Sequence, residues 1–421
     1  MKRILFLHHA GHRGGAGIML ANILRTLDRE RFQPIVVSPP GDIVGDLEST
    51  GAEVRIAPRP IRMFRHTSGF TWPAYSPDFL KDAILQWQDR GFWEQYFRQS
   101  GVDMVQLSSL VLAPLGVAAR RAGLPVVCLV QETLTRGVLG VRTTWLRHLL
   151  SRQMDAVVFI SEFDRRQAHC RAPITEAIPN WVDLAVFDRS LRREDARQTL
   201  GLPMDAEIIF FLGGMSKLKG TLILLRAVNE LRGRKNLHLV IAGYNAPLTR
   251  WLPSDVPRIY HAARRMLGSA YRATNRALGR DYLHRTMTFL SRMDHADRVH
   301  LVGMTENIVP YYAAADVVVF PATAAHQARP VLEAGAMAKP VVVSDFECLR
   351  EFVTHGRNGL VFPPGDWRAL AQALRQLFDD PEQAKLMGEE NYRNTCEQHD
   401  ARVNGPRFNA LYERVLSAQH E

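Results

Sequence analysis

Residues 317–344 hold two short apolar runs separated by a loop and a short helical pattern, and this unit constrains the fold more than any other. The runs Val317–Phe320 and Val341–Val343 have the length of buried strands. Between them, Pro330 suits a first helical turn, and Glu333 stands close behind it. In such a unit, backbone N–H groups and the positive end of the helix dipole point beyond the carboxyl end of the strand. The segment therefore predicts a site for a phosphorylated ligand, in which Glu333 takes sugar or ribose hydroxyls.

Strand and helix patterns alternate along both halves of the chain. In the first half, the apolar run Ile4–Leu7 is followed by a glycine-rich turn at residues 11–17 and an apolar helical period from Ile18 to Leu27. From Ile208 the alternation begins again. Further strands are predicted at residues 34–37, 102–107, 125–130, 156–160, 208–212, 238–242 and 299–302. We therefore expect an α/β protein with two parallel sheets, in agreement with a length of 421 residues.

The composition is that of an ordinary globular protein, with 46% hydrophobic and 23% charged residues. The four cysteines are scattered without a Cys-x-x-Cys motif, which argues against a disulfide framework or a zinc site and favours a reducing compartment. The N-terminal apolar run is too short for a signal-peptide core, and no apolar run reaches the ~18 residues of a spanning helix. These features predict a cytoplasmic chain that is either free or peripheral at the inner face of the membrane.

Three further stretches accompany residues 317–344 in a recognisable order and spacing. They are Phe210–Gly214 with Lys219 and Gly220, Ile178–Asp183 with Phe187, and Arg298–Gly303 followed by Tyr311, Tyr312 and Asp316. With these motifs the chain resembles the retaining GT-B glycosyltransferases of the large family four group, also described as glycosyl transferases group 1. The resemblance covers most of the chain.

This resemblance implies the GT-B fold, in which two Rossmann-like domains face each other. We expect residues 1–190 to form an acceptor domain and residues 191–385 to form a nucleotide-sugar donor domain. The donor domain would carry a basic helical insertion at about residues 245–297. Residues 386–421 would form C-terminal helices that pack back toward the first domain, with an interruption of the helical pattern near Gly405 and Pro406.

Lys219 follows the turn formed by Gly213 and Gly214 and precedes a predicted helix. A leaving diphosphate needs its developing charge neutralised, and a lysine beside a helix N-terminus does this without a metal ion. An isolated loop lysine would more often be simply solvated, but the position after a buried strand favours the catalytic role. Relatives commonly carry an arginine where Gly214 stands, and Lys217 is the expected substitute.

Glu333 matches the second glutamate of a pair that relatives carry eight positions apart. The first position is Ala325, so we expect the donor-sugar contact to come from His326, Gln327 or Arg329. Glu333 and His326 each have an alternative interpretation that involves no ligand. An acidic residue in a first helical turn stabilises the helix dipole by ~0.3 to 1 kcal/mol, and His326 could be an ordinary loop histidine. The predicted donor-binding residues of this domain are Gly213, Gly214, Lys217, Val302, Gly303, His326, Gln327, Ala328, Arg329 and Val331.

In the first domain, Gly14 and Gly15 are predicted to let the backbone approach a phosphate or sugar oxygen of the donor, although tight turns use the same residues. Many relatives carry a His-Asp pair after the Pro-Val-Val strand, where this chain has Gln131 and Glu132. A neutral glutamine cannot act as a general base, so Glu132 joins Lys219 and Glu333 as a predicted catalytic residue. The alternative for Glu132 is a buried or capping carboxylate.

The insertion between Gly243 and His300 is rich in arginine, with apolar and aromatic residues interleaved. The arginines that it carries include Arg250, Arg258, Arg264, Arg265, Arg272, Arg276, Arg280, Arg285 and Arg292. A basic amphipathic helix here could bind an anionic membrane surface or a phosphorylated acceptor, and a solvated helical elaboration is the competing interpretation. The net charge of +10 favours an anionic surface but also allows nonspecific attraction of anions.

We therefore predict a retaining, metal-independent hexosyltransferase of cell-surface polysaccharide or glycolipid synthesis. Its substrates would be a nucleoside-diphosphate sugar and an acceptor hydroxyl on a glycan or lipid-linked acceptor, with no cofactor, no metal site and no nucleic-acid partner. No Asp-x-Asp, Walker A or metal-ligand motif is present in the sequence. Two alternatives stay open, a nucleotide-sugar epimerase and a catalytically silent binding or partner subunit. The missing first glutamate, arginine and histidine make the silent subunit a credible alternative, whereas the pattern of carboxylates and histidines that an epimerase would need is not seen.

Overall fold

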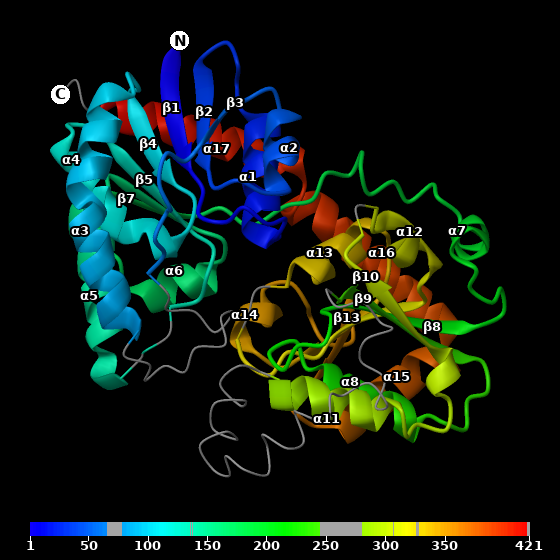
Figure 1. Cartoon of the computed structure of the whole chain (residues 1–421). Coiled ribbons are helices and arrows are strands. Elements are labelled where there is room, and N and C mark those ends of the chain that lie inside the picture. The colour runs from blue at the N-terminus through cyan, green and yellow to red at the C-terminus, as the bar shows by residue number, and fades with distance from the viewer. Residues whose placement is uncertain are drawn as a thin grey trace, which may run out of the picture. The chain divides into compact units, whose positions relative to one another are not determined.

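The computed structural model describes residues 1–64, 78–134, 136, 138–244, 280–305, 307–325 and 328–418. The chain forms two compact units (Figure 1). The first unit comprises Met1–Asp183 and Gln398–Glu421, and the second comprises Leu184–Glu397. Most of the basic insertion, residues 245–279, lies outside the described residues. Within the part of the chain that is described, no helix combines the length and the apolarity needed to cross a membrane.

The first unit is built on a seven-stranded sheet in the order β3-β2-β1-β4-β5-β6-β7, and every neighbouring pair is parallel. Its strands are β1 (Lys2–Leu7), β2 (Phe32–Ser38), β3 (Glu53–Ile56), β4 (Met104–Leu107), β5 (Val126–Val130), β6 (Ala156–Phe159) and β7 (Ile174–Ala177). The sequence pattern missed β3 and β7, the two edge strands, because they are half-exposed and contain no apolar run.

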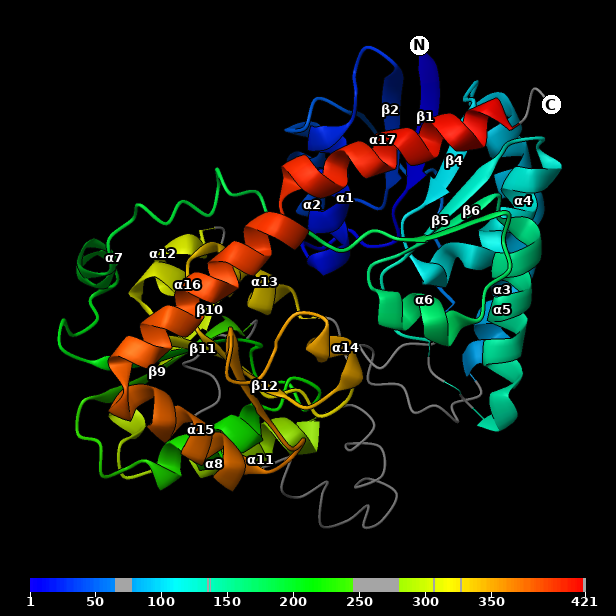
Figure 2. The same ribbon diagram turned by 180° about the vertical axis from the view of Figure 1, so that it is seen from behind.

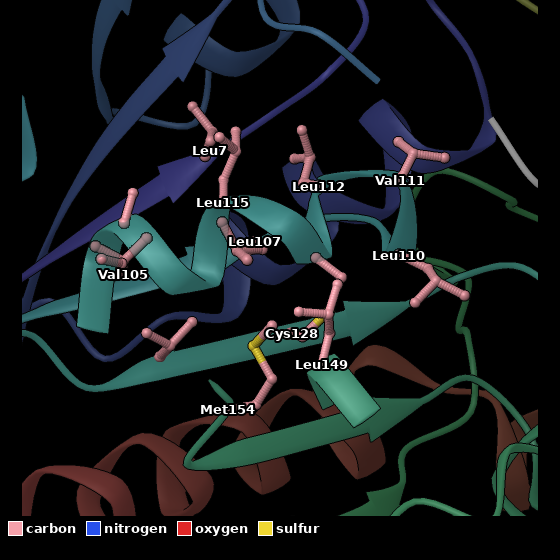
Figure 3. Close-up of a cluster of buried hydrophobic side chains, with 14 of the residues drawn as sticks. Leu7, Val105, Leu107, Leu110, Val111, Leu112, Leu115, Cys128, Leu149 and Met154 are labelled. Carbon is pink, nitrogen blue, oxygen red and sulfur yellow. The ribbon is translucent and has the colours of Figure 1, made fainter. Parts of the chain in front are cut away.

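Helices cover both faces of this sheet. They are α1 (Gly15–Thr26), α2 (Ile43–Glu48), α3 (Asp78–Gln99), η1 (Leu110–Leu115), α4 (Gly116–Arg121), η2 (Val138–Gly140), α5 (Val141–Gln153), α6 (Glu162–Ala168) and α17 (Ala401–Ser417). On one face, alternate strand residues pack with η1, α4 and α5, as Leu107 and Cys128 do in Figure 3. On the other face, seen in Figure 2, the intervening residues pack against α1 and α17. Each fully buried leucine or valine contributes about 1.5 to 3 kcal/mol to this core.

The C-terminal helical region breaks at a different place from the predicted one. Helix α16 (Pro381–Gln398) belongs to the second unit, and α17 runs without a break through Gly405 and Pro406. The interruption lies at Asp400, whose side chain caps α17 by accepting a hydrogen bond of 2.8 Å from the Arg402 amide. Gly405 instead brings α17 against α1, because a Cβ there would lie 2.5 Å from Cβ of Thr26.

The second unit contains a six-stranded parallel sheet in the order β10-β9-β8-β11-β12-β13. Its strands are β8 (Glu207–Leu212), β9 (Leu237–Tyr244), β10 (Val299–Gly303), β11 (Val317–Phe320), β12 (Val341–Ser344) and β13 (Gly359–Phe362). Its helices are α7 (Arg193–Leu200), α8 (Thr221–Glu230), α11 (Arg280–Leu290), η5 (Ala296–Arg298), α12 (Val309–Ala314), α13 (Arg329–Ala336), α14 (Glu347–Arg350), α15 (Trp367–Asp379) and α16. The two Rossmann-like α/β units that the sequence predicted are thus confirmed.

Strand order marks one special point in each sheet. In the first unit, β2 pairs with one side of β1, and β4, which comes later in the chain, pairs with its other side. In the second unit, β9 and β11 flank β8 in the same way. Loops after such neighbouring strands diverge to opposite faces of the sheet and leave a crevice beyond the carboxyl ends, where α/β proteins bind ligands. Lys219 and Glu333 follow β8 and β11 at the point in the second unit, and Gly14 and Gly15 follow β1 at the point in the first.

Candidate functional site

The loop between β8 and α8 is held against the end of β11. Gly220 adopts a left-handed conformation with φ +79°, and a Cβ there would lie 1.8 Å from the carbonyl oxygen of Pro321. Thr323 continues the contact, since its amide donates a 2.9 Å hydrogen bond to Leu218 O and its hydroxyl donates a 3.0 Å bond to Lys217 O. Only glycine permits this approach. The loop that carries Lys219 is therefore fastened to the loop that leads into α13, the helix of Glu333.

Lys219 presents a half-buried ammonium group at this point. Its Nζ lies 5.0 Å from the ring centroid of Phe320, and no hydrogen bond or ion pair of Nζ exists within the described ranges. Burial lowers the pKa of Lys219 to about 8, and the nearby Glu333 carboxylate opposes this shift. A cation that has lost water and has gained neither a hydrogen bond nor an ion pair attracts an anionic ligand strongly.

The first-turn N–H groups of α8 already have partners within the protein. The amides of Thr221 and Ile223 donate to Ser216 O and Gly220 O, at 3.3 and 2.9 Å. The amide of Leu222 donates a 2.8 Å bond to the hydroxyl of Tyr282, which comes from α11. The helix dipole still points toward Lys219, but these N–H groups are not free for a ligand. This leaves the Lys219 ammonium as the principal cationic group of the loop.

Glu333 is fixed on both sides. It is 3% exposed, Tyr312 Oη donates a 2.6 Å hydrogen bond to its Oε2, and Arg329 Nε donates a 2.5 Å bond to its Oε1. The helix α13 begins at Arg329, so Glu333 lies beyond the first turn, which contains no acidic residue. The helix-dipole reading of Glu333 is therefore wrong, because that effect fades within the first turn. A carboxylate held at both oxygens keeps lone pairs for further donors such as ribose hydroxyls.

The other predicted donor-binding residues of the second unit divide into three groups. Gly213 and Gly214 adjoin β8, and both amides donate to Ala242 O, while Lys217 is exposed in the same loop. Ala328 and Val331 are buried, so their side chains support the loop rather than meet solvent. Val302 and Gly303 end β10, two strands away from β8 at the same edge of the sheet. His326 and Gln327 lie outside the described residues.

In the first unit, Gly14 precedes α1 and Gly15 begins it. The first helical hydrogen bond runs from the Ile18 amide to Gly14 O, and the amides of residues 15–17 have no partner in the described structure. No atom lies within 4 Å of a Cβ placed on Gly15. The start of α1 therefore offers open space and free donors to an oxygen-bearing ligand.

Glu132 has the contacts of a capping carboxylate. Ser109 Oγ and the amides of Leu110 and Gln131 all donate to it, the amides at 3.2 and 3.1 Å. Burial raises the pKa of Glu132, and these three hydrogen bonds oppose the shift. Capping the start of η1 is a sufficient structural role for this carboxylate. The role of Glu132 as a general base therefore stays a prediction.

Sequence reasoning passed over four polar residues at or after the carboxyl ends of three strands in the first unit. His8 and His9 follow β1, Ser108 follows β4, and Thr133 lies three residues after β5. These strands are neighbours in the sheet. The signal available in the sequence was the His-His pair at the end of the first strand, which breaks an apolar run.

Together, two Rossmann-like units with glycine-rich loops at their switch points, and a lysine and a clamped carboxylate in one of them, define a GT-B glycosyltransferase. The family model described as "Glycosyl transferase 4-like domain" matches residues 14–181, and the model described as "Glycosyl transferases group 1" matches residues 192–394. The chain belongs to this glycosyltransferase family.

Curated relatives are similar over about half of the chain. The D-inositol 3-phosphate glycosyltransferase of Kineococcus radiotolerans is 30% identical over 224 residues, which cover 50% of this chain and 45% of that protein. The protein of the same description from Corynebacterium aurimucosum is 30% identical over 199 residues, covering 47% of this chain and 40% of its own length. The matched part thus spans less than half of each relative.

Solved structures resemble the chain over nearly its whole length. Anabaena HepE, crystallised in complex with UDP and glucose, superposes with a TM-score of 0.74 at 20% identity, covering 98% of this chain and 100% of HepE. Sucrose-phosphate synthase from Thermosynechococcus elongatus gives a TM-score of 0.68 at 19% identity, covering 99% of this chain and 100% of the synthase. At this identity the likeness is one of fold.

Proposed function

We propose that this glycosyltransferase moves a sugar from a nucleoside-diphosphate donor to the hydroxyl of a glycan or lipid-linked acceptor. The observation that carries the proposal is the unpartnered ammonium of Lys219 at the switch point of the second unit, where a diphosphate would restore its lost interactions. Structures titled as complexes with UDP and UDP-glucose among the fold neighbours support a uridine nucleotide as the first donor to try.

In the proposed reaction, the bond between the anomeric carbon and the diphosphate oxygen breaks while the acceptor oxygen bonds to that carbon. Lys219 stabilises the negative charge that develops on the diphosphate, so the chain supplies from a side chain the charge that a metal ion supplies in other transferases. Glu333 holds the ribose hydroxyls. The departing diphosphate oxygen takes the acceptor proton, and the family resemblance implies that the anomeric configuration is retained.

The decisive experiment incubates the purified full-length chain with UDP-, GDP- and ADP-sugars and measures release of the nucleoside diphosphate. Inositol 3-phosphate, the acceptor named in the curated relatives, belongs in the acceptor panel together with lipid-linked sugars. Proton NMR of the product reports whether its anomeric configuration matches that of the donor. An inverted product would overturn the retaining mechanism.

A silent binding subunit is the second candidate. It is favoured by Ala325 at the position of the first family glutamate and by the internal partners of both Glu333 oxygens. A silent subunit would bind a nucleotide sugar, which calorimetry measures, and would release no nucleoside diphosphate with any acceptor. The two measurements together separate the two functions.

The basic insertion is proposed to bind the anionic inner face of the membrane, where a lipid-linked acceptor in polysaccharide or glycolipid synthesis would lie. Exposed charges are screened beyond ~8 Å at physiological ionic strength, so binding to vesicles should rise with anionic lipid and fall with salt. Replacing Arg264, Arg265, Arg272 and Arg276 by glutamine should lower vesicle binding and leave donor binding intact. Equal sedimentation of the two proteins with vesicles would exclude this membrane role.

A further inference from the structure

The helix α8 begins without a capping side chain of its own. Its N-cap residue is Gly220, in a left-handed conformation. An N-cap side chain normally accepts a hydrogen bond from an amide two or three positions into the helix. Gly220 has no side chain to accept it, and no larger residue fits, because a Cβ there would lie 1.8 Å from the carbonyl oxygen of Pro321. The start of α8 therefore needs an acceptor from another element.

Tyr282 supplies that acceptor from α11. Its Oη accepts a 2.8 Å hydrogen bond from the amide of Leu222, the second residue of α8. Burial raises the pKa of Tyr282, and the bond from the Leu222 amide opposes the shift, so the phenol is uncharged at neutral pH. The cap is thus a neutral group. Unlike Asp400, which caps α17, it brings no negative charge to the helix start that follows Lys219.

The helix α11 fixes Tyr282 because it is built into the core of the second unit. Figures 1 and 2 both show α11 alongside α8. Thr286, one turn after Tyr282, is buried, and its hydroxyl donates a 2.7 Å bond to Tyr282 O. Three apolar side chains of α11 pack in the same cluster as those of α8, namely Met287, Phe289 and Leu290. The described helix of the insertion is therefore a structural part of this unit.

The start of α8 is bonded to the loop that carries Lys219. Thr221, the first residue of the helix, accepts a 3.0 Å bond from the Ser216 amide and donates a 2.7 Å bond to Gly214 O. The amide of Gly220 donates to Ser216 O at 3.1 Å, and the amide of Lys219 donates to Ser216 Oγ at 3.4 Å. A displacement of the first turn of α8 would therefore displace Lys219 as well.

The surroundings of the Lys219 ammonium depend on this support. Nζ lies 5.0 Å from the ring centroid of Phe320. Burial lowers the pKa of Lys219 to about 8, and the Glu333 carboxylate on α13 opposes the shift. If the loop moved away from β11, the ammonium would regain water and its pKa would return toward 10.5. The pKa of Lys219 therefore reports on its position.

We propose that Tyr282 is a positioning residue of the transfer reaction, which caps α8 and thereby holds Lys219 at the place of the leaving diphosphate. The inference rests on the proposed function for the role of Lys219, whereas the effect of Tyr282 on Lys219 can be measured without a substrate. It gives the described helix of the insertion a role in the donor site.

The first test follows the titration of the lysine side chains by NMR in the full-length chain, labelled with ¹³C-lysine. Lysine stands at positions 2, 81, 217, 219, 235, 339 and 385. Burial lowers the pKa of Lys219 and of Lys339 to about 8, and Lys219→Met distinguishes their signals. In Tyr282→Phe, the pKa of Lys219 should rise toward 10.5. Lys339, between α13 and β12, should titrate as in the wild type and is the internal control.

The second test uses steady-state kinetics with a donor that the chain turns over. Tyr282→Phe keeps the ring and removes the acceptor of the Leu222 amide, and the displaced Lys219 should lower kcat by about 10- to 100-fold. KM for the donor should change less than kcat, because the charge on the diphosphate develops in the transition state.

Leu290→Ala is the matched control on the same helix. It removes packing from α11 and keeps the bond between Tyr282 and α8, so it should lower the midpoint of urea unfolding. The Lys219 titration and the kcat of the folded protein should stay as in the wild type.

An unchanged Lys219 titration in Tyr282→Phe would overturn the proposal even if stability or kcat fell, because Tyr282 would then act on folding alone. A shifted titration with a wild-type kcat would also overturn it. If no nucleotide sugar binds or reacts, the proposed function fails, and the lysine titration still decides whether Tyr282 holds Lys219.

Discussion

In the second unit, some residues hold the candidate site in place, and others are proposed to act on the ligand. In the described structure the Lys219 ammonium contacts the Phe320 ring and has no hydrogen bond or ion pair, whereas Glu333 is held by Tyr312 and Arg329. Removing a half-buried cation without an ion pair relieves a desolvation cost, whereas removing a buried carboxylate leaves its partners Tyr312 and Arg329 unpaired and lowers stability. Substitutions at the two positions should therefore have opposite effects on folding although both affect the donor site.

Lys219→Met should lose activity without losing stability. Methionine keeps the length of the side chain and removes the charge, so the leaving diphosphate loses a stabiliser worth about 2.7 to 4 kcal/mol, or about 10²- to 10³-fold in kcat. The free energy of unfolding should stay equal or rise, because an unpartnered ammonium is no longer buried. Steady-state kinetics and urea unfolding measure both effects, with the exposed Lys235→Met as control. An unchanged kcat at saturating donor would remove Lys219 from the reaction.

Tyr312→Phe should weaken nucleotide binding through Glu333. The substitution removes the 2.6 Å hydrogen bond to Oε2 and leaves ring packing on Phe210 in place. Loss of a bond to a charged group costs about 1.5 to 3 kcal/mol of stability. In calorimetry with UDP, the effects of Tyr312→Phe and Glu333→Gln should be less than additive, because both act on one carboxylate. Tyr311→Phe is the control, and full additivity would separate Tyr312 from Glu333.

At the scale of elements, the site depends on loops pressed against strand ends. The β8–α8 loop touches the end of β11 at Gly220, and the Tyr282 hydroxyl from α11 bonds the amide of Leu222 in α8. The described end of the insertion thus reaches the first turn of α8, which follows the loop that carries Lys219. This arrangement could not be predicted from the local pattern, since 60 residues separate Tyr282 from Leu222.

Gly220→Ala tests the contact between these loops. The added methyl group would meet Pro321 O at 1.8 Å in a conformation with φ +79°, so the loop must move away from β11. A strained left-handed residue costs about 1 to 3 kcal/mol, and the free energy of unfolding should fall by at least this much. Turnover should fall further, because Lys219 is displaced. Gly233→Ala, where a Cβ meets nothing within 4 Å, should change neither quantity. A stable and fully active Gly220→Ala protein would contradict the geometry.

For the whole molecule, buried histidines predict loss of stability in acid. Burial lowers the pKa of His8 to about 3 and of His9 and His399 to about 4, from 6.5. Below pH 6.5 the unfolded chain binds protons that the folded chain excludes, so the stability present above pH 6.5 is lost as pH falls toward about 4. Each of these histidines contributes a slope of up to about 1.4 kcal/mol per pH unit.

Urea unfolding at pH 7.5, 6.5 and 5.5 measures this slope for the full chain. The variant His399→Gln retains a polar side chain near Asn180 O, the partner of His399 Nδ1 at 3.0 Å, and loses the titrating ring. It should show a shallower dependence than the wild type, and the exposed His148→Gln should not. Identical slopes for the wild type and His399→Gln would exclude His399 as a source of the effect.

The sequence alone determined the class of the molecule and most of its strands. Buried parallel strands appear in the sequence as short apolar runs, and turns that pass close to a neighbouring strand require glycine. Both features are therefore visible in the local sequence. From these signals, Lys219 was predicted to follow one buried strand and Glu333 another. The order and spacing of the stretches around them then gave the resemblance to the family. The half-exposed edge strands β3 and β7 left no such signal, and the edge strand β13, which is mostly buried, was also not predicted.

Only the tertiary structure decided which side chains share an environment. The order of strands in the sheet places β1 beside β4 and β8 beside β11, although long stretches of chain separate them. The Tyr312–Glu333 bond and the Tyr282 contact with α8 join residues far apart in the chain. Local periodicity reports whether a residue is buried, and it carries no information about which distant residue will be its neighbour.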